Sequence, residues 1–101
     1  GAGYVGILAI DVHLPDVHSL KAKRHELSVL RTDLTRRFGA AVAEVDHHDL
    51  WQRALVTAVL VDRRASEVER RLGDVEDYLA GRWDGARVDH RAVVAPEDLD
   101  G

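Results

Sequence analysis

The 101-residue sequence contains no cysteine and no methionine, and it has only two prolines and one phenylalanine. Without cysteine, the chain can form no disulfide, no thiolate metal site and no cysteine nucleophile. It has no glycine-rich phosphate loop, no signal-peptide pattern and no apolar run near the roughly 18 residues that span a bilayer. We therefore expect a cytoplasmic protein without a cofactor or a membrane partner.

Hydrophobic residues make up 46% of the sequence, which is enough for a packed core at this length. The size predicts a single domain over residues 1–95, followed by a flexible tail over residues 96–101. Charge is spread unevenly: 18 acidic residues outnumber 14 basic ones, which argues against non-specific nucleic-acid binding by the whole surface. Residues 21–37, however, hold six basic and only two acidic side chains, so a local basic patch is expected.

Hydrophobic periodicity predicts four strands, over residues 4–14, 40–48, 53–62 and 86–95. It also predicts two helices. The first covers residues 19–38, with Ser19 as its N-cap, and the second runs from a Ser66–Glu69 capping box to Gly81. The order β-α-β-β-α-β is typical of the ferredoxin-like α+β fold, a four-stranded antiparallel sheet of order 4-1-3-2 with both helices on one face.

This fold brings the ends of the first two strands, the loop at 49–52 and the start of the first helix to one end of the molecule. Strand parity places a polar cluster on the open face of the sheet there, with Arg53 between its members, which are Asp11, His13, Glu44, Asp46 and His48. The rest of the open face is apolar. We therefore expect a homodimer, or a partner protein, to cover that face.

Four short segments resemble the YlxP-like family of small bacterial proteins, a domain of unknown function. They are His13-Leu14-Pro15, SLKAKR at 19–24, AEVDH at 43–47 and DLWQRA at 49–54. The resemblance covers residues 4 to about 94, essentially the whole domain. It implies a ferredoxin-like fold and genes often found beside those for translation and ribosome-maturation factors. It implies no catalytic residues.

Three hypotheses follow for the function. The first is a non-catalytic accessory protein that contacts ribosomal RNA or a ribosome-associated protein through Lys21, Lys23, Arg24, Trp51 and Arg53. The second is a homodimeric protein-interaction module with no RNA role, in which a tryptophan closes the core or anchors the dimer. The third and weakest is an enzyme that uses the acid–histidine cluster, with His13 and His48 as weak candidates for metal ligands.

Overall fold

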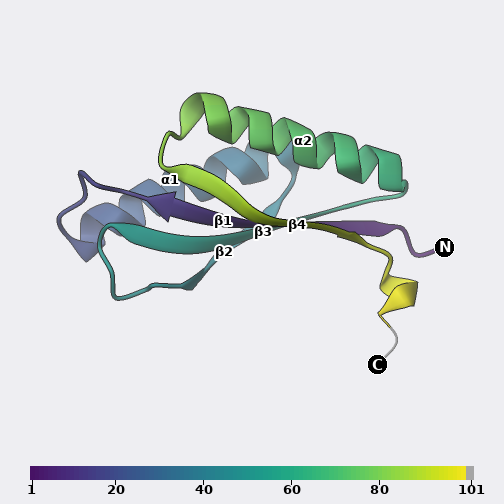
Figure 1. Cartoon of the computed structure of the whole chain (residues 1–101), viewed down its shortest axis with the longest axis horizontal. Helices are drawn as coiled ribbons and strands as arrows, with labels where there is room; N and C mark the ends of the chain where they lie inside the picture. Colours follow the sequence, from purple (N-terminus) through teal and green to yellow (C-terminus); the bar gives the residue numbers. More distant parts are fainter. Residues whose placement is uncertain (100–101) are drawn as a thin grey trace.

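A computed structural model describes residues 1–99 and contains the predicted ferredoxin-like α+β fold (Figure 1). Its four-stranded antiparallel sheet has the order β2-β3-β1-β4, which is the predicted order. Both α-helices cover one face of this sheet, and the opposite face carries no α-helix within the described chain. The elements, in chain order, are β1 (Tyr4–His13), α1 (Leu20–Phe38), β2 (Ala41–Asp46), β3 (Arg53–Asp62), α2 (Ala65–Arg82), β4 (Ala86–Val94) and the short 3-10 helix η1 (Pro96–Asp98).

The core lies between the helices and the sheet. Alternate residues of β1 and β3 point into it, as the period of two in their sequences predicts. Helical spacing supplies the facing side chains from Leu30 and Leu34 of α1 and from Val68, Leu72, Val75 and Leu79 of α2. Gly6 lies beneath α2, where a Cβ would approach Val68 to 2.6 Å, so glycine allows this helix to pack closely on β1.

The ends of α1 follow the prediction. The Ser19 hydroxyl accepts a hydrogen bond from the Ala22 amide at 3.0 Å, and Gly39 ends the helix in the left-handed region at φ 67°. The predicted capping box of α2 is wrong. This helix begins two residues earlier, with Arg64 as the N-cap and no side-chain hydrogen bond there, so Ser66 lies inside the first turn and cannot cap it.

The predicted faces of β2 are also wrong. Val42 is paired with Ala58 and Glu44 with Val56, so both lie on the helix-covered face. A bulge between Glu44 and Asp46 then returns Asp46 to the open face, opposite Leu55. The strand ends there rather than at His48, because His47 adopts a positive φ of 67°. A one-residue shift exchanges the two faces of a strand, and this shift divides the predicted polar cluster.

The N-terminal residues lie beside η1. The Ala2 amide donates a hydrogen bond to Glu97 Oε1 at 2.5 Å. Of the tail predicted to be flexible, residues 96–98 thus form η1, and residues 100 and 101 lie outside the described residues. No helix within residues 1–99 has the length and apolar character needed to cross a membrane.

Candidate functional site

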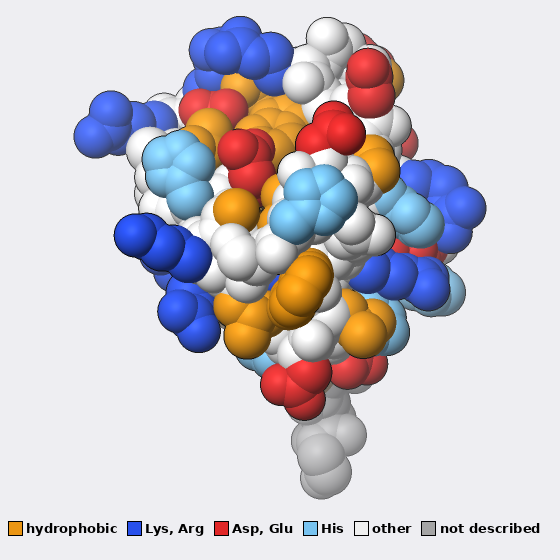
Figure 2. All heavy atoms as spheres, turned by 90° about the vertical axis from the view of Figure 1, so that its left-hand side faces the viewer, with side chains coloured by type: hydrophobic (Ala, Val, Ile, Leu, Met, Phe, Trp, Pro, Cys, Tyr) orange, Lys and Arg blue, Asp and Glu red, His pale blue; other side chains and the backbone are white. Residues whose placement is uncertain are grey.

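Three separate segments meet at one end of the molecule, which we call the polar end. They are residues 11–26, 44–53 and 82–87, and the second of them includes the β2–β3 loop. The His13 amide donates to the Gly85 carbonyl at 2.8 Å, and the Leu14 amide donates to the Gln52 carbonyl at 2.9 Å. Figure 2 looks onto this end and shows histidine, acidic and basic side chains around exposed hydrophobic ones.

On the open face, the polar end holds an ion cluster around Asp11. This carboxylate is only 3% exposed, and the half-exposed Arg53 guanidinium contacts both of its oxygens, through Nε at 3.3 Å and Nη2 at 3.0 Å. Arg87 adds a contact at 3.4 Å and pairs with Asp89 as well. The hydrogen bond from Arg53 is the main cause that lowers the pKa of Asp11, against the effect of burial. Asp11 is therefore a charged anchor for Arg53.

On the helix-covered face, a second cluster surrounds Lys23. Its side chain is 2% exposed, and its Nζ lies 2.8 Å from Glu44 Oε2 and 2.6 Å from the His47 carbonyl oxygen. His48 Nε2 lies 3.9 Å from the other oxygen of Glu44. Lys23 was predicted to contact RNA, but burial withdraws its ammonium from solvent, which argues against such a contact. It ties α1 to the β2–β3 loop instead.

The predicted polar cluster is thus two clusters, one on each face of the sheet. Asp11 and His13 lie on the open face, with Asp11 Oδ1 3.8 Å from His13 Nε2. Glu44 and His48 belong to the Lys23 cluster, and Asp46 caps the backbone amide of His47 at 2.7 Å. Within residues 1–99, no group of three or more histidine, aspartate or glutamate side chains is arranged to hold a metal ion.

The β2–β3 loop is fastened on both sides although its largest side chains face solvent. Gln52 Nε2 donates to the carbonyls of Pro15 at 3.1 Å and Val17 at 3.2 Å. Lys23 holds the other side of the loop at the His47 carbonyl. Leu50 and Trp51 between these anchors are 49% and 50% exposed. Sequence analysis found Trp51 but missed the role of Gln52, since a glutamine in a short loop carries no signal of its bonding partner.

Arg87 was also missed as a partner of Asp11. A bulge in β4 opposite Ala9 and Ile10 brings Arg87 into register with Asp11. No residue pattern in either strand predicts this bulge. Gly85, just before β4, is a clearer signal. A Cβ there would overlap the carbonyl oxygen of His13, so only glycine permits the close approach that starts the β1–β4 pairing.

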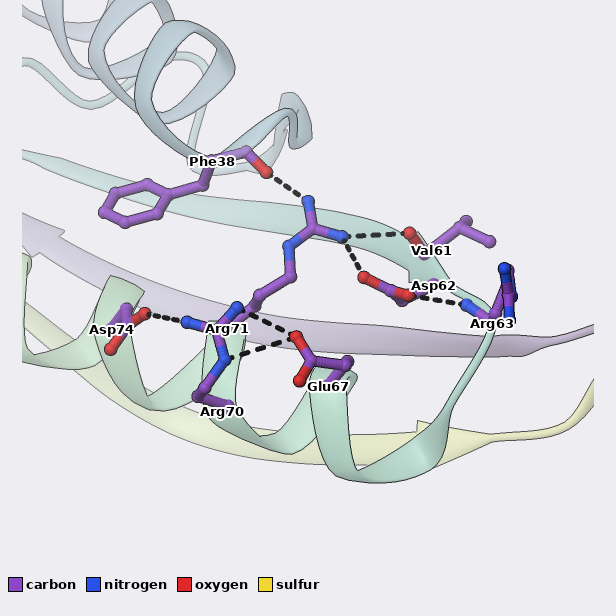
Figure 3. Close-up of polar contacts among 8 residues, drawn as sticks. All are labelled: Phe38, Val61, Asp62, Arg63, Glu67, Arg70, Arg71 and Asp74. Atoms are coloured by element: carbon purple, nitrogen blue, oxygen red, sulfur yellow. Dashed lines mark hydrogen bonds and ion pairs between the residues drawn. The ribbon is translucent and has the colours of Figure 1, made fainter.

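The outer face of α1 carries several exposed cations along its length. Lys21, Arg24, Arg31 and Arg36 are all exposed, and none has a carboxylate within 4 Å among residues 1–99. Two of the three arginines of α2, Arg70 and Arg71, differ, as Figure 3 shows. Arg70 pairs with Glu67 at 2.9 Å and with Asp74 at 3.1 Å. Arg71 pairs with Asp62 at 3.0 Å and also donates to the carbonyls of Phe38 and Val61.

Two open hollows flank His13 at the polar end, and each is lined by one of the two tryptophans. One, of about 680 Å³, lies between the β1–α1 connection and the end of α2 and includes Trp83 and Lys21. The other, of about 540 Å³, is formed by the β2–β3 loop with His18 and includes Trp51 and Arg53. Both hollows are within the size range of small-ligand sites.

These features define a small ferredoxin-like α+β domain in which histidine and other polar side chains gather at one end of the sheet. The chain belongs to the family described as a protein of unknown function (DUF503), whose model matches residues 5–92. A search of curated proteins found no match. The family description names no activity, so the function proposed below rests on the geometry of the polar end and of the two helices.

Proposed function

We propose that the protein is a non-catalytic accessory factor that binds ribosomal RNA, and that the outer face of α1 contacts the phosphate backbone. One observation carries the proposal: none of the exposed cations of α1 has an acidic partner among residues 1–99, whereas two of the three arginines of α2, Arg70 and Arg71, are paired with carboxylates. The third, Arg82, is exposed at the polar end without such a partner in the described chain. Unpaired Lys and Arg side chains on one helix face form the electrostatic footprint of a nucleic-acid surface.

The structure changes the set of proposed contacts. Lys23 no longer belongs to it, and Arg53 takes part with a guanidinium already engaged by Asp11. Lys21 and Arg24 remain, and Arg31 and Arg36 extend the surface along the same helix. The resemblance to the YlxP-like family, whose genes often neighbour those for translation factors, supports an RNA partner connected with the ribosome.

The test is a titration of a structured ribosomal RNA fragment at several salt concentrations. With about four phosphate contacts, the logarithm of affinity should fall against the logarithm of salt with a slope of about −3. The double variant Lys21→Glu/Arg24→Glu should weaken binding about tenfold or more and reduce that slope by about 2. The variant Arg64→Glu/Arg70→Glu alters the net charge equally at α2, and it should retain the affinity within about threefold.

Two results would contradict the proposal: no binding of the unaltered protein at low salt, or equal losses in the two double variants. Equal losses would mean that only the net charge matters. The test therefore separates a defined surface on α1 from a general attraction between the protein and an anion.

The open face of the sheet favours a second candidate, a homodimeric protein-interaction module. Apolar side chains from three strands lie there together, including Ile7, Val59, Val61 and Val94, and Val61 is 60% exposed. Such a face is usually covered by a partner. Sedimentation at micromolar concentration tests this candidate, since a monomer with the mass of one chain would exclude it.

A further inference from the structure

We propose that the Trp51 hollow is a stacking site for an unpaired RNA base, so that the protein selects single-stranded segments next to the phosphates held by α1. This inference rests on the proposed RNA function and adds its substrate class. It concerns a different surface from the phosphate-binding face, and the two can fail separately.

The first argument is that Trp51 stays exposed although its loop is held in place. An exposed tryptophan on a mobile loop would turn its ring away from water by packing on the protein surface. Here the hydrogen bonds from Gln52 and Lys23 fasten both sides of the loop, and the indole is still half exposed. The backbone that carries the exposed ring is therefore held in place before binding, which lowers the ordering cost of stacking a ligand on it.

The second argument is the lining of the hollow. Beside Trp51, it presents His13, His18 and the planar guanidinium of Arg53, and Asp49 is its one acidic member. Both carboxylate oxygens of Asp11 accept hydrogen bonds from Arg53, and these bonds orient its planar guanidinium. Flat π-faces next to cationic or histidine side chains suit a nucleobase attached to a phosphate, and they suit an aliphatic protein side chain poorly.

The third argument is position. His18 lines the hollow and directly precedes Ser19, the N-cap of α1. The first turn of α1 contains no acidic residue, and Lys21 and Arg24 follow Ser19 within the first two turns. A strand that places a base on Trp51 therefore meets positive charge and a helix N-terminus one step along its backbone. A base inside a duplex cannot reach Trp51, because its faces are covered by its neighbours.

The experiment uses the full chain carrying Trp83→Phe, so that Trp51 is the only tryptophan and its fluorescence reports the hollow. Two RNA probes of equal length and charge are titrated, one unstructured and one a closed hairpin duplex. We expect quenching of Trp51 by the unstructured RNA. On adding Trp51→Ala, we expect about a tenfold loss of affinity for the unstructured RNA, measured by anisotropy, and less than a twofold change for the duplex.

Trp51→Phe and Trp51→Leu then separate stacking from simple apolar contact, and the melting temperature of each variant confirms that it folds. Phenylalanine should retain most of the affinity for unstructured RNA, and leucine should lose as much as alanine. If neither RNA binds the starting protein, the proposed RNA function fails and this inference fails with it. If both RNAs bind but Trp51→Ala weakens neither, or weakens both equally, the base-stacking site alone is overturned.

Discussion

The two helices cover the same face of the sheet and are almost equal in length, yet their surfaces are opposite in charge (Figure 1). α1 has six basic and two acidic residues, and α2 has three basic and five acidic residues. Both helices bury leucine and valine side chains against the sheet in the same way. Apolar packing therefore does not require the difference in charge between the two outer faces.

The paired charges show the same contrast. On α2, Glu67 and Asp74 enclose Arg70, and Glu69 and Glu76 hold Arg91 of β4. On α1, two cations serve the fold: Lys23 is buried, and Arg37 lies over the ring of Tyr78 at 4.6 Å. Lys23 near the start of α1 and Arg71 beneath its end thus fix this helix to the rest of the protein, and the other cations remain at the surface.

The largest effect that we predict concerns this division of roles along α1. Lys23→Met should lower the free energy of unfolding by about 3 kcal/mol, because Glu44 and the His47 carbonyl lose their partner in a largely dry site. Lys21→Met, on the exposed face of the same helix, should change stability by less than about 0.5 kcal/mol. Denaturation in urea measures both variants.

A double-mutant cycle tests the cause of that loss. If the ion pair is responsible, Glu44→Gln should recover part of the stability lost in Lys23→Met, with a coupling energy of about 1 kcal/mol or more. Equal stability losses in Lys21→Met and Lys23→Met would contradict the burial of Lys23 and return it to the RNA-binding set.

Acid should weaken the contacts of α2 in a defined pH range. The Arg63 amide, at 2.7 Å, and the Arg71 guanidinium lower the pKa of Asp62 below its usual 3.8. A carboxyl group whose pKa is lower in the folded protein stabilises it above the unfolded value, and that contribution is lost as pH falls through the folded value. Stability measured by denaturation should therefore fall below about pH 4, in part through Asp62.

Asp62→Asn is the variant that checks this assignment. It should flatten the loss of stability below about pH 4, since the group that binds the proton is gone. Asp49→Asn, an exposed change in the β2–β3 loop, is the matched control and should follow the curve of the unaltered protein. Superimposable curves for Asp62→Asn and the unaltered protein would show that the Arg71 contacts do not depend on this charge.

The fold was predictable from the sequence because apolar residues repeat with the period of each element, as the buried residues of β1, β3 and α2 show. The faces of β2 were not, because Ala40, Ala41 and Ala43 give little alternation and the bulge at Glu44 has no sequence signal. The burial of Lys23 did have a signal. Lys23 is in phase with Leu27, Leu30 and Leu34, on the apolar stripe of α1, and its charge concealed the pattern.

The smallest effect that we predict concerns the acidic residues of α2. It tests whether their negative charge alone prevents RNA from binding to this helix. Glu67→Gln/Asp74→Asn removes both partners of Arg70 and leaves three acidic residues beside the three basic ones of this helix. If RNA lies along α1 and does not reach α2, screening over roughly 8 Å at physiological salt limits the effect of the freed Arg70, so affinity should rise by less than about threefold. The RNA titration described above measures this change. A rise of about tenfold would show that RNA contacts α2 once its acids are removed, and the contrast between the two helices would then reflect their charge and not the position of the binding surface.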